Sequence, residues 1–113
     1  MKDVMKLLPL GSVLRLKGSQ KPVMVIGVCP QSQNEHGEAV MNDYIGVMYP
    51  EGYISSNLFM VFNSEDIDEV VVEGYRGSGE WEQYLNLVEK ALEVLYNKEK
   101  SAAIDEDTAK DLI

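Results

Sequence analysis

The fold is decided by the stretch 49-YPEGYISSNLFMVFNSEDIDEVVVEGY-75 in the second half of the chain. It contains a Pro-Glu-Gly sequence at 50–52, an apolar run at 58–62 and a run of three valines at 70–72. Proline and glycine in this arrangement favour a tight turn, whereas β-branched and aromatic residues favour strands. Carboxylates at 64–69 favour the first turn of a helix. The stretch therefore predicts a turn and two strands joined by a short helical turn, with no evident catalytic set.

Three further strands are predicted upstream of this stretch. Apolar and basic residues alternate over 12–17, which is typical of a half-exposed strand. The almost wholly apolar run 22–28 predicts a buried central strand that forms a hairpin with the first. Gly27 lies inside this run, where a glycine indicates a bulge or a close approach of another backbone. A third strand is predicted at 43–49 from its tyrosines and β-branched residues.

The segment 30–42 is polar and predicts a loop that carries the single histidine, His36. The single cysteine, Cys29, precedes it. One histidine and one cysteine are too few for a zinc site with the usual nitrogen and sulfur ligands. The two could in principle act as a nucleophile and a base, but a solvated histidine and a small buried thiol account for them more simply. We expect no catalytic, metal or cofactor site, and a protein that is not an enzyme.

One long helix is predicted at 80–100, where apolar residues recur at helical spacing. The stripe on its main face comprises Trp81, Tyr84, Leu85, Val88, Leu92, Leu95 and Tyr96. This stripe predicts that the helix covers one side of the sheet and that Trp81 is largely buried. Leu87 and Val94 lie off the main face and leave room for a second contact. The remaining residues, 101–113, form a short acidic tail.

These elements predict an α+β fold. With 113 residues, of which 45% are hydrophobic, the chain has the usual size of one domain and enough apolar side chains for a core. We expect 1–113 to be a single domain with a β-rich part at 7–76. Its sheet should be small, curved and antiparallel, with about five strands, either open or closing into a partly open barrel. The helix should pack on this sheet.

Charge limits the classes of partner. The formal net charge is −9 at neutral pH. Binding to nucleic acid phosphates or to an anionic membrane depends on clustered Lys and Arg, so we expect neither. No stretch has the length of a membrane span, and the N-terminal apolar run is interrupted by Pro9 and Gly11, unlike a signal peptide. A single cysteine fits a reducing compartment. We expect the protein to be cytoplasmic.

Tyrosines and carboxylates around the turns are the candidate contacts for a protein partner. Tyrosine suits interfaces because it joins a large rigid ring to a polar tip, although it is equally common at the edge of a core. In the acidic turn we expect the polar side chains of 63–66 and 68–69 to face solvent. Ile67 and Val70, three residues apart, should point inward from one helical face. The candidate contact residues are Tyr49, Glu51, Tyr53, Asp66, Asp68, Glu69, Glu73 and Tyr75.

Several short runs occur together in a characteristic order. They are LPLGSV at 8–13, DYIGV at 43–47, YPEGY at 49–53, FN at 62–63, DIDEV at 66–70 and EGY at 73–75. Over roughly residues 7 to 85, the chain resembles a family of small bacterial proteins known as domain of unknown function 4176. Many members carry a basic residue after an Ile-Gly pair. This chain has Val28 and Cys29 there, so no role of that basic residue is carried over.

The resemblance implies a function in toxin export. Members of this family typically lie beside LXG-type polymorphic toxins and type VII secretion genes of Gram-positive bacteria. A protein of this family is therefore expected to bind an LXG-type toxin or a secretion component as an adaptor or chaperone. The alternative is an immunity protein that blocks a cognate toxin, with acidic side chains that mimic nucleic acid. The resemblance supplies no catalytic residues.

Overall fold

The computed structural model describes residues 3–100, with side chains as far as Leu95. The chain divides into two compact units. One unit is Lys6–Gly77, and the other combines Met1–Met5 with Ser78–Ile113. The assignment of 1–113 to a single domain stays a prediction. The acidic tail at 101–113 lies outside the described residues.

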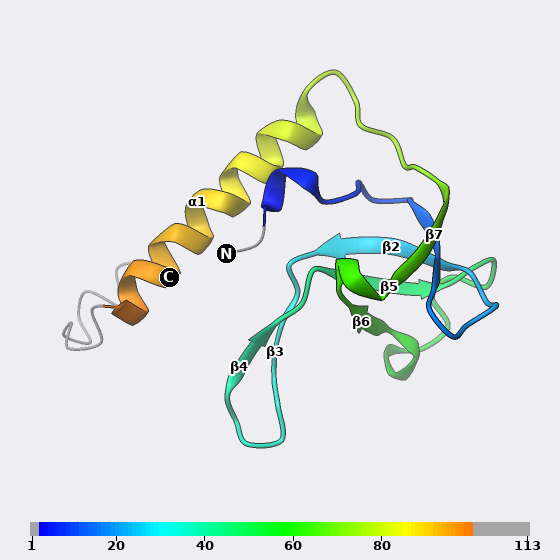
Figure 1. The fold of residues 1–113 in the computed structure, drawn as a ribbon, viewed down its shortest axis with the longest axis horizontal. Coiled ribbons are helices and arrows are strands. Elements are labelled where there is room, and N and C mark those ends of the chain that lie inside the picture. The colour runs from blue at the N-terminus through cyan, green and yellow to red at the C-terminus, as the bar shows by residue number, and fades with distance from the viewer. Residues whose placement is uncertain (1–2, 101–113) are drawn as a thin grey trace. The chain divides into compact units, whose positions relative to one another are not determined.

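The unit Lys6–Gly77 contains an antiparallel five-stranded sheet with the strand order β6-β5-β2-β1-β7 (Figure 1). Its strands are β1 (Val13–Leu16), β2 (Val23–Val28), β5 (Tyr44–Met48), β6 (Met60–Phe62) and β7 (Ile67–Val72). The predicted α+β class and the five strands are confirmed. The sheet does not close into a barrel, because β6 and β7 form its two edges.

The predicted hairpin of β1 and β2 is confirmed, and β2 lies at the centre of the sheet. The predicted irregularity at Gly27 is also present. The pairing of β2 with β5 shifts register between Val25 and Gly27. A Cβ atom at Gly27 would lie 2.9 Å from Ile45 Cγ2, so the glycine allows the close approach of this neighbour.

The segment 30–42 is not the simple loop that its polarity predicts. It forms a second, two-stranded sheet from β3 (Gln31–Gln33) and β4 (Ala39–Met41), which extends away from the larger sheet (Figure 1). Asn34 organises the turn, because its Oδ1 accepts hydrogen bonds from the backbone N–H groups of His36 and Glu38. The prediction failed because Gln and Ser in β3 give no apolar alternation, and turn chemistry makes the ribbon instead.

The acidic turn is shorter than predicted. The 3-10 helices η2 (Ser56–Leu58) and η3 (Ser64–Asp66) flank β6, and β7 begins at Ile67. Ile67 is half-buried, but Val70 is 45% exposed, so the expected inward orientation of Val70 is wrong. The reason is geometric: residues three apart share a helical face but point to opposite faces of a regular strand.

Both faces of the sheet contribute to the core of the unit, because the consecutive β1 residues Val13 and Leu14, whose side chains point to opposite faces, are both buried. Cross-strand partners share a face, and the partners Tyr44 and Phe62 stack with ring centroids 5.3 Å apart. Leu14 and its partner Val23 are fully buried in the middle of the sheet. The buried hydrophobic residues of this unit are Leu7, Val13, Leu14, Val23, Val25, Tyr44, Val47 and Phe62.

The predicted helix is confirmed as α1 (Glu80–Lys100), and the short helix η1 (Val4–Lys6) lies near the start of the chain. On the stripe of α1, Trp81 is 8% exposed and Leu85 is fully buried, as predicted, whereas Tyr84 is 48% exposed. The side chain of Tyr96 lies outside the described residues. The packing of the helix on the sheet stays a prediction. No helix in the described residues is long and apolar enough to span a membrane.

Candidate functional site

The eight candidate contact residues fall into two groups within the sheet unit. Tyr49, Glu51 and Tyr53 follow β5, whereas the other five lie in or beside β7. Because β2 and β1 separate β5 from β7 in the sheet, the two groups belong to different strands and edges. The structure therefore offers two candidate surfaces in place of the one acidic and aromatic surface expected from the sequence.

The first group surrounds a turn whose charge is already paired. Lys21 Nζ lies 2.7 Å from Glu51 Oε2. The hydrogen bond from Lys21 is the main cause that lowers the pKa of the Glu51 carboxyl. Tyr53 is 68% exposed, and its ring contacts that of Phe59 with centroids 5.5 Å apart. This turn thus presents aromatic surface rather than an unpaired carboxylate.

Most carboxylates of the second group also have partners within the chain. Glu69 Oε2 lies 3.1 Å from the Arg15 guanidinium, and Glu73 pairs with Arg76. Asp66 Oδ2 accepts a hydrogen bond of 2.8 Å from the backbone N–H of Asn63, which fastens the start of η3. These contacts reduce the field that the acidic segment can present to a basic partner.

The edge strand β7 carries three exposed valines. The sequence predicted that they form a strand but not that they are exposed. Val70, Val71 and Val72 are 45%, 45% and 53% exposed. A regular strand with one covered face would bury alternate side chains, but the pairing of β7 with β1 shifts register twice and breaks that alternation. We use "β7 surface" for Asp68, Val70, Val71, Val72 and Tyr75.

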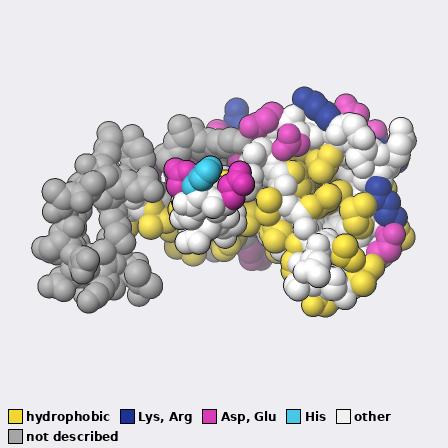
Figure 2. Space-filling view, turned by 90° about the horizontal axis from the view of Figure 1, so that it is seen from below, with side chains coloured by type: hydrophobic (Ala, Val, Ile, Leu, Met, Phe, Trp, Pro, Cys, Tyr) yellow, Lys and Arg dark blue, Asp and Glu magenta, His cyan; other side chains and the backbone are white. Residues whose placement is uncertain are grey.

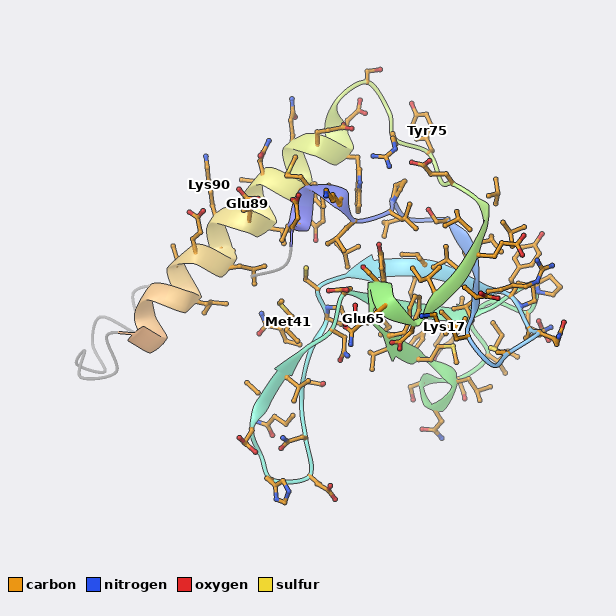
Figure 3. All side chains as sticks on the ribbon, in the orientation of Figure 1. Lys17, Met41, Glu65, Tyr75, Glu89 and Lys90 are labelled. Atoms are coloured by element: carbon orange, nitrogen blue, oxygen red, sulfur yellow. The ribbon has the colours of Figure 1, made fainter. Side chains whose placement is uncertain are left out.

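Tyr75 is the most exposed large side chain of the β7 surface. It is 84% exposed and extends away from the connection that follows β7 (Figure 3). Within the described part of the chain no ring contacts it, whereas the rings of Tyr44 and Tyr53 each contact a phenylalanine. An exposed tyrosine next to a row of exposed valines has the composition of an interface centre.

The opposite edge carries a second apolar surface, which the sequence analysis also missed. Tyr53, Ile54, Leu58 and Val61 are each at least 47% exposed, and Phe59 is 36% exposed. Hydrophobic side chains gather on the face of the sheet unit seen in Figure 2, with charged side chains toward its margins. The available signal was the absence of any charged residue from 52 to 64.

The runs that carry the family resemblance also make contacts that stabilise the fold. Ser12 is fully buried, and its Oγ donates to the carbonyl oxygen of Pro9 at 2.7 Å and accepts from the Gly74 N–H at 2.9 Å. A Cβ atom on Gly74 would lie only 2.1 Å from the Leu10 carbonyl oxygen. The run at 8–13 therefore holds the run at 73–75 through backbone contacts that only small residues allow.

A second set of hydrogen bonds joins the start of β5 to the end of β6. Asp43 is buried, and its Oδ2 accepts from the Ser64 N–H at 2.8 Å. In return, Asn63 Oδ1 accepts from the Asp43 N–H at 3.0 Å. The Tyr44 hydroxyl accepts from the Leu8 N–H at 2.9 Å. These residues have clear structural roles, whereas Tyr53 and Tyr75, at 68% and 84% exposed, are the most exposed large hydrophobic side chains of the runs.

Cys29 and His36 do not have the surroundings of a nucleophile and base pair. Burial and, second, the charge of Asp43 raise the pKa of the Cys29 thiol, which opposes formation of the reactive thiolate. Cys29 adopts a φ of 54° at the end of β2, and His36 lies in the exposed turn of the β3–β4 ribbon. Among residues 3–100, no group of three or more His, Cys, Asp or Glu side chains could hold a metal ion.

Comparison with known proteins identifies the family of the chain but no individual related protein. No curated protein and no solved structure matches the chain. One family, described as "Domain of unknown function (DUF4176)", matches residues 7–82. This match covers the entire sheet unit from Leu7 onward and the start of α1. The chain therefore belongs to the DUF4176 family.

Proposed function

We propose that this protein is a non-enzymatic binding protein, an adaptor or chaperone for an LXG-type toxin of a type VII secretion system, and that it acts in the cytoplasm. Membership of the DUF4176 family supports the choice of partner, given the genes beside which such proteins typically lie. The β7 surface is the observation that carries the proposal, because it exposes three consecutive valines and Tyr75 together.

The free energy gained by burying the exposed valines of the β7 surface is too small for binding by these residues alone. Burying three half-exposed valines contributes on the order of 3 kcal/mol, at about 1.5–3 kcal/mol for a fully buried side chain. Association costs at least about 4 kcal/mol in lost freedom of motion. The valines alone are therefore insufficient, and Tyr75 is the side chain best placed to supply the remainder as a central anchor.

Charge indicates what the partner should look like. Asp68 is exposed within the β7 surface, and the Arg15–Glu69 and Glu73–Arg76 pairs lie beside it. A partner with an apolar strip and a basic residue opposite Asp68 would match this pattern. The immunity alternative has less support, because Glu51, Glu69 and Glu73 are all ion-paired within the chain and are poor mimics of a phosphate backbone.

The test is co-purification with an LXG protein encoded by an adjacent gene. The two proteins, co-expressed, should elute together from a sizing column. The double variant Val71→Ser and Tyr75→Ala should weaken the measured affinity at least about tenfold, which corresponds to about 1.4 kcal/mol. It should not change the circular dichroism spectrum, because both side chains are exposed.

Met41→Ser is the matched control, because Met41 is a strand residue that is 40% exposed on the separate β3–β4 ribbon (Figure 3). It should leave the affinity unchanged. Separate elution of the two wild-type proteins at micromolar concentration would contradict the proposed function. A complex that tolerates the double variant would keep the function but remove the β7 surface from it.

A further inference from the structure

The two edges of the five-stranded sheet differ in how they are protected against pairing with another strand. Proteins guard exposed edges with charges, bulges and short strands. β7 has both Asp68 and Glu69 and two register shifts in its pairing with β1. β6 has the sequence Met-Val-Phe, and no register shift interrupts its pairing with β5. Of these devices, β6 retains only its short length.

The backbone of β6 is extended beyond the three residues of the strand. Phe59 continues the extended backbone before the strand (φ −77°, ψ 148°). Asn63 is also extended (φ −116°, ψ 166°), but its N–H and C=O are both hydrogen-bonded to Asp66, so the free edge is the run 59–62. In the described part of the chain, β6 pairs with β5 alone. Side chains alternate along it, since Phe62 is 4% exposed and Val61 is 47% exposed.

The edge is free of charge in a highly charged chain. Charged residues make up 26% of the sequence, yet none occurs from 52 to 64. Depletion of charge together with exposed aromatic and aliphatic side chains is typical of the centre of an interface. Because the chain carries a net charge of −9, an uncharged edge is also where a second copy can approach with least repulsion.

The sequence around β6 suits antiparallel pairing with itself. In a register centred on Val61, Val61 of one copy faces Val61 of the other, and Met60 faces Phe62. In the same register Glu65, the first carboxylate after the edge, falls opposite Asn57, so acidic side chains do not meet directly. A two-fold symmetric contact must be complementary to itself in this way.

We propose that two copies of this chain associate through antiparallel pairing of β6 about a two-fold axis at Val61. The two five-stranded sheets then form one continuous sheet, and Phe59 and Val61 of each copy bury their exposed surface against the other. This association is independent of the proposed toxin binding. It uses the edge opposite β7, so each copy keeps its β7 surface at the outer end of the joined sheet.

The experiment is sedimentation velocity of the full-length protein over a range of concentrations, with two matched variants. Val61→Lys and Val71→Lys introduce the same charge at edge-strand valines that are 47% and 45% exposed. The wild type and Val71→Lys should form dimers, whereas Val61→Lys should remain monomeric with an unchanged circular dichroism spectrum. We expect Val61→Lys to raise the dissociation constant of the dimer by at least about tenfold.

Cysteine cross-linking tests the register itself. Directly opposed residues in an antiparallel pair have Cβ atoms about 4.5–5.5 Å apart, close to the reach of a disulfide. In a Cys29→Ser background, Val61→Cys should give a covalent dimer on mild oxidation, and Val71→Cys should not.

Three results would overturn the proposal. The first is a wild-type protein that is monomeric up to about 100 μM. The second is a dimer that Val61→Lys leaves intact. The third is a covalent dimer that forms equally from Val71→Cys. A monomeric wild type whose toxin complex is lost in Val61→Lys would assign this edge to a different protein and would also reject the second copy.

Discussion

At the scale of single residues, Gly74 tolerates a side chain least among the described glycines. The Leu10 backbone passes so close that a Cβ atom would lie 2.1 Å from its carbonyl oxygen, and the Gly74 N–H donates to the buried Ser12 hydroxyl. The neighbouring atoms are backbone and cannot rotate away as a side chain could. A side chain at this position therefore has to displace a main-chain segment or break the hydrogen bond.

Gly74→Ala should lower the free energy of unfolding by about 3 kcal/mol or more, because it adds a steric overlap to the loss of a part-buried hydrogen bond. Chemical denaturation followed by circular dichroism measures this change. Tyr75→Ala, at the adjacent and 84% exposed position, should change stability by less than about 0.5 kcal/mol. Equal stabilities of the two variants would mean that the segment at 8–12 can move without cost.

At the scale of elements, α1 shows a clear division between its faces. Trp81 and Leu85, four residues apart, are 8% and 0% exposed, whereas Leu87 is 65% exposed. Helical geometry places residues four apart on one face. Burial of a large aromatic side chain at the first turn makes this face the main source of stability for the helix, since isolated helices are marginal in water.

Trp81→Ala should therefore reduce the free energy of unfolding by about 3–5 kcal/mol, the usual effect of truncating a buried large aromatic side chain. Leu87→Ala removes a comparable apolar group from the exposed face and should cost less than about 0.5 kcal/mol. Thermal denaturation by circular dichroism compares the two. If Trp81→Ala melts with the wild type, its side chain is dispensable for folding and becomes a candidate contact residue.

Elements whose apolar pattern was strong could be predicted from the sequence. The period of two in β1, the apolar run of β2 and the helical stripe of α1 identify their own structure, and Gly27 identified its irregularity. The β3–β4 ribbon could not be predicted this way, because the Asn34 side chain organises its turn and β3 contains only Gln and Ser.

The candidate site was less predictable than the fold. Exposure of Val70 depends on β7 being an edge strand and on its two register shifts with β1, which are properties of the pairing and not of the valines. Likewise, the carboxylate of Glu69 could be recognised from sequence, but its pairing with Arg15, 54 positions away, could not. The sequence gives the type of each residue. Whether its charge or apolar side chain can contact a partner depends on residues far away in the sequence.

At the scale of the whole molecule, we expect the two compact units to unfold together. Among the described residues, the unit with α1 comprises 3–5 and 78–100, most of which form this helix. Such a unit has little apolar surface to bury by itself. The expectation of one domain therefore implies a single cooperative transition for both units.

The sequence has a single tryptophan, Trp81, which lies in α1, so its fluorescence reports on the surroundings of this helix. Gly74→Ala lies in the sheet unit and should lower the midpoint of the fluorescence transition as much as that of the circular dichroism transition. Coincident midpoints in the wild type and in this variant would support one cooperative domain. A tryptophan transition that does not move with Gly74→Ala would show that the helical unit unfolds independently.

The turn of the β3–β4 ribbon offers a place to carry foreign sequence. Its residues 34–38 are all exposed, and the Asn34 side chain closes the turn from one end. Lengthening a surface loop is inexpensive, at about 0.6 kcal/mol for each doubling. The ribbon is a separate sheet, so an insertion at its tip leaves the pairing of the other five strands untouched. An epitope or fluorophore placed between His36 and Gly37 would label the protein for detection or capture without altering either apolar edge of the sheet.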